Sequence, residues 1–94
     1  APRVSVGSLL EVGLLHVGQV LYFRGDRRQG ARLRADGHLL LEGFEGSIHQ
    51  AGRHLMGGSP CNGWDHWYYE ADGGVLHPIE GLREQFRGFG HPAG

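Results

Sequence analysis

Several residue types are missing or rare in this chain of 94 residues. It has no lysine and no threonine, so all nine basic residues are arginine, and Cys61 is its single cysteine. A lone thiol has no partner for an internal disulfide, so we expect an apolar core to hold the fold in a reducing compartment. No apolar run approaches the ~18 residues of a membrane span, and the N-terminus lacks the pattern of a signal peptide. These absences predict a cytoplasmic protein that has no membrane partner.

Glycine, by contrast, is abundant, with 18 residues. Glycine-rich chains are often disordered, but two tryptophans, three tyrosines and four phenylalanines supply apolar area that a disordered chain lacks. A chain of this length can bury one modest core. We therefore expect a small single domain of the α+β class over residues 1–94, with a core of about residues 4–88 and a frayed tail of residues 89–94.

The first half of the chain predicts a helix followed by an antiparallel meander. Ser5 or Ser8 can cap a short N-terminal helix that Gly13 ends. β-branched and aromatic residues then alternate with polar ones, and Asp36-Gly37 is a strong two-residue hairpin signal. The expected strands of the meander are residues 19–23, 31–35 and 38–42.

The second half predicts two further helices and up to two more strands. We expect the glycine-rich segment 43–46 to break the sheet, and Ser47 to cap a helix with one apolar stripe. Residues 64–70 and 75–77 are predicted as strands, giving a sheet of three to five strands. Pro78 is suited to the first turn of the last helix, because its missing N–H is not needed there.

The charge is distributed unevenly along the chain, although its net value is only −1. Residues 1–34 hold six arginines against two acids, whereas residues 35–94 hold three arginines against eight acids. Arginine binds phosphate oxygens bidentately, so a cluster on a hairpin can hold a nucleic-acid backbone. The alternative is a solvated strand face, and the near-neutral total favours weak or assisted binding. The arginines in question are Arg24, Arg27, Arg28, Arg32 and Arg34.

The chain offers little for catalysis or metal binding. Among its seven histidines, His49 and His54 are five residues apart and do not share a helical face. Cys61 and His66 have no second thiol nearby, whereas a zinc site needs four well-placed ligands. No serine or cysteine stands in a recognised nucleophile motif, and no phosphate-binding glycine motif is present. We therefore expect no metal, no catalytic residue and no cofactor in this chain.

The most specific local feature is the segment from Cys61 to Trp67. Asn62 can offer a donor and an acceptor to a base edge, and an exposed tryptophan can stack on an unpaired base. In so small a domain Trp67 is expected in the core. For Trp64 two roles remain open, a place in the core and the stacking of its ring on a base. Ser47 is a helix cap, and the N–H groups of a helix start also attract anions, so capping and contact are compatible.

These features together resemble the C-terminal domain of the cell-cycle-regulated (CcrM-type) N6-adenine DNA methyltransferases. That domain belongs to the wider group of restriction-enzyme-adenine-methylase-associated domains. The resemblance covers about residues 4–88, and the 17-residue offset between Ser47 and Trp64 is its most specific part. It is carried by Val6-x-x-Leu9-Leu10-x-x-Gly13-Leu14-Leu15-x-x-Gly18-x-x-Leu21, Ala35-Asp36-Gly37, Gly46-Ser47-Ile48-His49, Cys61-Asn62-Gly63-Trp64-x-x-Trp67 and Pro78-Ile79-x-x-Leu82-Arg83.

The resemblance implies that the chain is a DNA-recognition domain and not itself an enzyme. The S-adenosylmethionine site and the Asp-Pro-Pro-Tyr motif would belong to a separate N-terminal methyltransferase domain. The parent enzyme would act on adenine in double-stranded GANTC as a dimer, opening the duplex locally, in a nucleoid-associated setting. Ser47, Asn62 and Trp64 would contact DNA, with His49 and Arg34 in support.

Two other functions remain compatible with the residues. The domain could act as a stand-alone reader of modified adenine in DNA. It could also be a protein-interaction or dimerisation module whose aromatic residues meet another protein. Salt dependence separates DNA binding from an apolar protein interface, because phosphate contacts release counterions.

Overall fold

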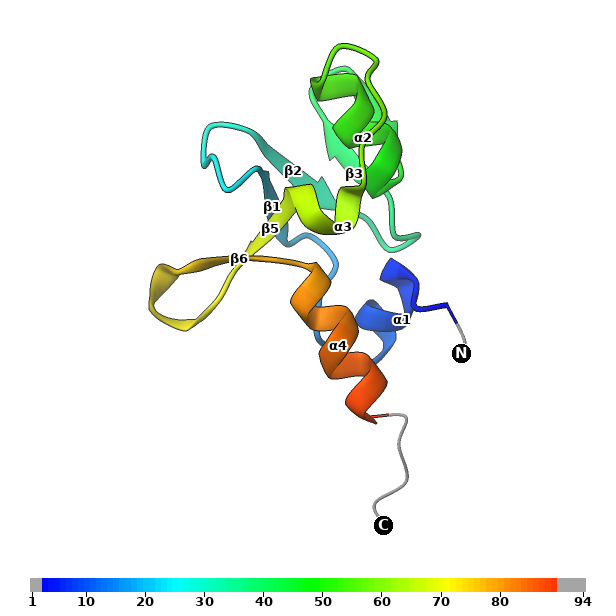
Figure 1. Cartoon of the computed structure of the whole chain (residues 1–94), viewed down its shortest axis with the longest axis vertical. Helices are drawn as coiled ribbons and strands as arrows, with labels where there is room; N and C mark the ends of the chain where they lie inside the picture. Colours follow the sequence, from blue (N-terminus) through cyan, green and yellow to red (C-terminus); the bar gives the residue numbers. More distant parts are fainter. Residues whose placement is uncertain (1–2, 90–94) are drawn as a thin grey trace.

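The computed structural model describes residues 3–89. Within this range the chain forms one antiparallel sheet in the order β4-β3-β2-β1-β5-β6, together with four helices (Figure 1). The strands are β1 Val20–Phe23, β2 Gly30–Leu33, β3 Leu39–Leu41, β4 Phe44–Gly46, β5 Trp67–Glu70 and β6 Leu76–Pro78. The helices are α1 Val6–Glu11, α2 Ile48–Leu55, α3 Gly63–His66 and α4 Glu80–Phe89, and a 3-10 turn, η1, spans Asp72–Gly74. The α+β class is confirmed.

The predicted meander forms the centre of the sheet. β1, β2 and β3 pair in antiparallel order, with Val20 opposite Arg32 and Arg32 opposite Leu40. Gly37 turns the chain between β2 and β3 at φ 84°, a conformation that favours glycine, and its N–H donates to the Arg34 carbonyl. The hairpin lies where the sequence predicts it, but its turn differs from the expected two-residue one: Arg34 pairs with His38, so residues 35–37 form a three-residue loop in which Gly37 alone has positive φ.

Four local expectations need correction. Segment 43–46 does not break the sheet: Gly43, at φ 75°, makes a tight turn and β4 pairs with β3. The predicted strand 64–70 begins only at residue 67, because residues 63–66 form helix α3. Pro78 ends edge strand β6, where a missing N–H costs no ladder bond, and α4 begins at Glu80. Phe89, expected in the frayed tail, is the last residue of α4, and residues 90–94 lie outside the described range.

The side chains on the two faces of the sheet differ in how deeply they are buried. Burial alternates along β1 and β2, so that Leu21 and Leu33 enter the core while Arg32 points the other way. The core continues through Trp67 and into the helices. On the opposite face Leu40 is 47% exposed. One face of the sheet therefore carries the core, and the other is largely open.

The helices lie in two groups around the covered side. α2 packs on β3 and β4 and touches α3, whereas α1 packs against α4 near the two ends of the chain (Figure 1). None of the helices in residues 3–89 is long and apolar enough to cross a membrane. The space between the two groups is where most of the predicted site residues meet.

Candidate nucleic-acid interface

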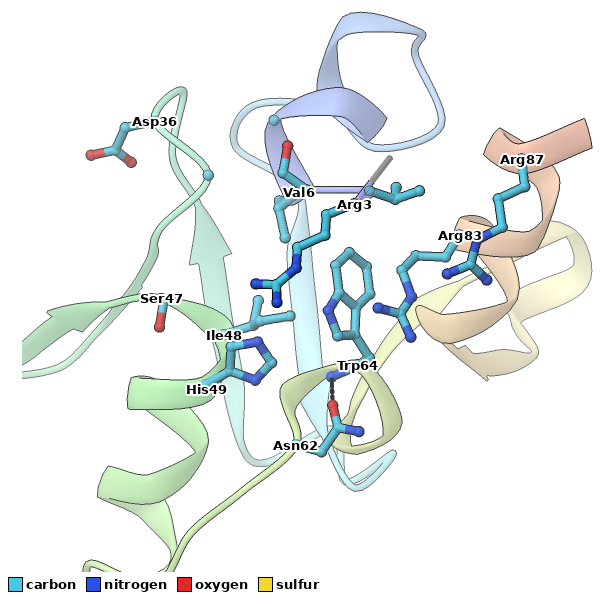
Figure 2. Close-up of a pocket in the computed structure, with 14 residues that line it drawn as sticks. Arg3, Val6, Asp36, Ser47, Ile48, His49, Asn62, Trp64, Arg83 and Arg87 are labelled. Atoms are coloured by element: carbon cyan, nitrogen blue, oxygen red, sulfur yellow. Dashed lines mark hydrogen bonds between the residues drawn. The ribbon is translucent and has the colours of Figure 1, made fainter. Parts of the chain in front are cut away.

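A groove of about 780 Å³ opens where the start of the chain, the starts of α2 and α3, and α4 come together (Figure 2). Four of the nine predicted site residues line it, namely Ser47, His49, Asn62 and Trp64. The groove therefore unites the two segments that carried the most specific part of the resemblance. Its other lining residues are Arg3, Val4, Ser5, Val6, Gly7, Asp36, Gly37, Ile48, Arg83 and Arg87.

Ser47 is fixed by a reciprocal cap at the start of α2. Its Oγ accepts a hydrogen bond from the Gln50 N–H at 3.1 Å, and the Gln50 side chain accepts from the Ser47 N–H at 2.9 Å. The predicted helix cap is thereby confirmed. Since Oγ accepts from within the protein, its own O–H remains able to donate to a ligand in the groove.

His49 is oriented by the chain segment opposite it. The backbone N–H of Gly63 donates to His49 Nδ1 at 2.9 Å. An imidazole that accepts at Nδ1 carries its proton on Nε2 when neutral, so the free nitrogen of this exposed ring is a donor. The same hydrogen bond ties the start of α3 to α2.

Asn62 caps α3 and is largely occupied in doing so. Its Oδ1 accepts from the Trp64 N–H at 3.1 Å (Figure 2), and its Nδ2 donates to Asp65 Oδ2 at 2.9 Å. The acceptor half of the amide is therefore used by the fold. One N–H of the amide remains for a ligand. From the sequence, Asn62 could offer both a donor and an acceptor to a base edge, whereas the structure leaves only the donor.

The junction between α2 and α3 depends on Gly63 and Trp67. A Cβ at Gly63 would lie 2.6 Å from the carbonyl carbon of Ile48, closer than such atoms approach. Trp67 is fully buried, as predicted, and its Nε1 donates to the Ile48 carbonyl at 2.8 Å. Both contacts hold the start of α2 against α3, so they set the spacing of Ser47 and Asn62 across the groove.

Trp64 belongs to the core, although its ring borders the groove. It is 7% exposed, and the Arg83 guanidinium carbon lies 4.5 Å above the ring centroid. This resolves the two alternatives that the sequence left open. The ring is not an exposed platform for a base in this structure, because its cover includes the arginine (Figure 2).

Three arginines that the sequence did not single out as site residues border the groove. Arg3 comes from the start of the chain, and Arg83 and Arg87 come from α4. In Figure 2 Arg3 points toward His49 and Trp64, and Arg87 lies beyond Arg83. Only Arg83 had a sequence signal, because it stands in the segment 78–83 that carried part of the resemblance. Arg3 and Arg87 could not be grouped without the contact between α1 and α4.

The five arginines predicted to hold phosphates lie elsewhere, since none of them lines the groove. Arg27 donates to Glu70 and to the Gly74 carbonyl, both at 2.6 Å. Arg28 donates through Nε and Nη2 to the two oxygens of Asp26. These guanidinium groups are already engaged by acceptors of the protein itself.

The remaining three hairpin arginines also have contacts within the fold. Arg32 donates to the Gly18 carbonyl at 2.7 Å, and Arg34 donates to Glu45 at 2.9 Å. Arg24, at φ 55°, lies over the Phe23 ring at 5.4 Å. The cluster is therefore dispersed and only in part available to an external anion.

The surroundings of Asp26, Asp36 and Cys61 shift the pKa of each of these side chains. The side-chain hydrogen bond from Arg28 lowers the pKa of Asp26, and the backbone N–H of His38 does the same for the pKa of Asp36. Both carboxylates are thus ionised at neutral pH. Burial raises the pKa of the Cys61 thiol, so it is protonated there.

Among residues 3–89, one group of side chains approaches the arrangement of a metal site. Atoms of Asp36, His38 and Glu45 that can ligate lie within 4.8 Å of one another. Arg34 sits in the same cluster, 2.9 Å from Glu45 and 3.6 Å from Asp36, and supplies the positive charge that a cation would bring. These side chains together form an ion-pair network.

The chain forms a small α+β domain with a groove that is bordered by arginines and hydrogen-bond donors. Residues 1–88 match the Restriction Enzyme Adenine Methylase Associated (RAMA) family. The chain belongs to this family, and the resemblance is confirmed at that level.

Proposed function

We propose that the groove binds the sugar–phosphate backbone of DNA and that the domain is a recognition module of an N6-adenine DNA methyltransferase. The observation that carries this proposal is the pattern of donors in the groove. An acceptor atom of Ser47, His49 and Asn62 is taken by a backbone N–H of the protein itself, and a donor is left over in each. A surface of donors suits a ligand made of acceptors.

The charge of the groove supports the same class of ligand. Arg3, Arg83 and Arg87 converge on it, and the acid that lines it is Asp36. Arginine and short polar side chains are the usual partners of phosphate oxygens in protein–DNA complexes. The association of RAMA domains with adenine methylases supports DNA as that polyanion.

The proposal includes a parent enzyme of the CcrM type. A separate N-terminal domain would bind S-adenosylmethionine and methylate adenine in GANTC within a dimer. This domain would position the enzyme and help to open the duplex, since a base must leave the stack to be methylated. The arginines of the β1–β2 hairpin would contribute at most peripheral phosphate contacts, and the site of action would be the nucleoid.

The test is DNA binding by this chain, measured by fluorescence anisotropy with a short labelled duplex containing GANTC. We expect salt-dependent binding, with log K falling by about 0.9 per phosphate contact for each unit of log salt. A scrambled duplex, a duplex methylated at adenine and a single strand serve as matched controls. Stronger binding to the methylated duplex would favour a reader of modified adenine.

A protein-interaction module is the second candidate, and the open face of the sheet favours it. Leu40 is 47% exposed there, and Tyr22 and Tyr68 face each other across β1 and β5 on the same side. Aromatic and aliphatic residues of this kind form the centres of protein interfaces. Two results together would support this candidate. The domain would show no salt-dependent DNA binding, and it would self-associate in a way that Leu40→Glu abolishes.

A further inference from the structure

The stack of Arg83 on Trp64 changes what the tryptophan can do in the groove. The guanidinium carbon lies 4.5 Å from the ring centroid, and the Arg83 side chain is only 23% exposed. Trp64 itself is 7% exposed. A nucleic-acid base can therefore reach the covered ring face only by displacing an arginine that is already packed there.

Arg83 is held in place on a second side by its own helix. Its Nη2 lies 2.5 Å from Glu80 Oε2, but the two are not aligned as a hydrogen bond, so the contact is an ion pair. The Nε atom of Arg83 is buried and has no hydrogen-bond partner among residues 3–89. A guanidinium has five N–H donors, and a buried donor without a partner is costly.

Arg83 and the hairpin arginines differ in how many guanidinium nitrogens have a partner within the protein. Arg28 places two of its nitrogens on one carboxylate, whereas Arg83 has an ion pair at one nitrogen and an unused donor at another. Nε is buried, so the donor that a phosphate in the groove can reach while Glu80 stays beside Arg83 is Nη1, which has no hydrogen-bond or ion-pair partner among residues 3–89. The ring of Trp64 meanwhile fixes the plane of the guanidinium, which lowers the entropy lost on binding.

We propose that Arg83 contacts a DNA phosphate directly, and that Trp64 is a positioning residue that acts through Arg83 instead of stacking on a base. The inference rests on the proposed function, because it takes the groove as the DNA site. It assigns the effect of the tryptophan on DNA binding to the arginine that lies on it.

A double-mutant cycle separates the two roles of Trp64. We expect Arg83→Gln to weaken binding of the labelled duplex about tenfold and to reduce the salt slope by about one. Trp64→Leu, which removes the ring face, should weaken binding to a similar extent in the wild-type background and less than about twofold in the Arg83→Gln background. Arg53→Gln, an exposed arginine outside the groove, is the matched control and should change neither affinity nor slope.

A conservative variant and a spectroscopic signal complete the test. Trp64→Phe keeps an aromatic face and should bind within about threefold of wild type. Stacking of a base on Trp64 would quench its fluorescence, whereas a phosphate held by Arg83 should leave the emission nearly unchanged. Trp67 is fully buried and gives a constant background.

Each outcome bears on the inference. Equal losses from Trp64→Leu in both backgrounds, or strong quenching by DNA, would overturn it. Should Trp64→Leu fail to fold by circular dichroism, the effect of Trp64→Phe and the quenching of the wild-type protein decide the matter. Unchanged binding by Arg83→Gln, with wild-type binding intact, overturns this inference alone. Wild-type protein that binds no DNA overturns the proposed function as well.

Discussion

The arginines of the β1–β2 hairpin and those of the groove differ in what their guanidinium groups contact. In the hairpin, Arg27 and Arg28 each use two nitrogens on acceptors of the protein, and their charges lie beside Glu70 and Asp26. In the groove, Arg83 and Arg87 pair with Glu80 and Glu84 of their own helix, whereas no acid lies within 4 Å of the Arg3 guanidinium among residues 3–89. The hairpin has more arginines along the sequence, but those of the groove come from the two ends of the described chain and border one place.

The proposed anion site therefore rests on the convergence of arginines on one groove, and less on local density of charge along the chain. Arg83 and Arg87 are themselves paired with Glu80 and Glu84, so what distinguishes the three groove arginines is that they border one groove, which none of the five hairpin arginines does. Exposed ion pairs add little to stability, so the hairpin pairs mainly withdraw charge from use by a ligand. Four predictions test the comparison, beginning with the change that should have the largest effect.

Gly63→Ala should disrupt the groove at its base. The added Cβ would meet the backbone of Ile48 at 2.6 Å, so α2 and α3 must separate, at a cost of about 3 kcal/mol of unfolding free energy. Urea denaturation gives the value. Gly81→Ala, in an open position of α4, is the control and should be neutral or stabilising by up to about 1 kcal/mol. Equal stabilities would contradict the close approach.

Replacing pairs of arginines compares the two groups directly. Arg3→Gln with Arg87→Gln should weaken DNA binding about 100-fold, since each lost charge-assisted contact is worth about tenfold or more. Arg27→Gln with Arg28→Gln should weaken it less than about threefold, because these two arginines do not line the groove. Anisotropy at one fixed salt concentration measures both. A larger loss in the hairpin pair would reverse our assignment of the two regions.

Ser47 variants separate capping from contact. Ser47→Ala should cost about 1 kcal/mol of unfolding free energy through loss of the cap. Ser47→Asp should restore that stability, because aspartate caps well, yet reduce DNA affinity by placing a negative charge at the groove. Parallel denaturation and binding curves give both quantities. If the aspartate variant binds DNA as well as wild type, Ser47 does not face the backbone of the duplex.

The smallest effect is expected from Glu70→Gln, which releases Arg27 from its partner. Both side chains are about half exposed, so the unfolding free energy should change by less than about 0.5 kcal/mol. DNA affinity should rise, by at most about threefold, because a hairpin arginine becomes free. A fall in affinity would show that the ion pair itself orients Arg27 for the ligand.

Local chemistry was sufficient to predict the elements whose signals lie within a few residues. The position of the turn at Gly37 and the Ser47 cap were predicted correctly because each is made by neighbours in the chain. β4 was missed because its glycines read as breakers. In the structure Gly46 is a strand residue whose missing Cβ leaves room for Gln50, 2.8 Å from where that atom would be. The side chains that crowd this position are Gln50, which is fixed in the capping box, and Phe44, so close packing and not flexibility accounts for the glycine, and composition does not reveal that.

The sequence was likewise sufficient for one part of the candidate site and not for the rest. Ser47, His49, Asn62 and Trp64 were chosen together through the resemblance, and the structure places them around one groove. The arginines of residues 24–34 lie outside this groove, and their contact with DNA stays a prediction. The Arg27 partner is Glu70, 43 residues further along the chain, and such pairing cannot be read from spacing.

The groove also joins the first and last described segments of the chain, Arg3 and α4, through the packing of α1 on α4. A site built in this way exists only while both end segments are docked, so partial unfolding of either would abolish it. Any ligand of the groove is then thermodynamically linked to that docking and must favour it. Amide hydrogen exchange in α1 and α4 should consequently slow when the groove is occupied, even at residues that the ligand does not touch.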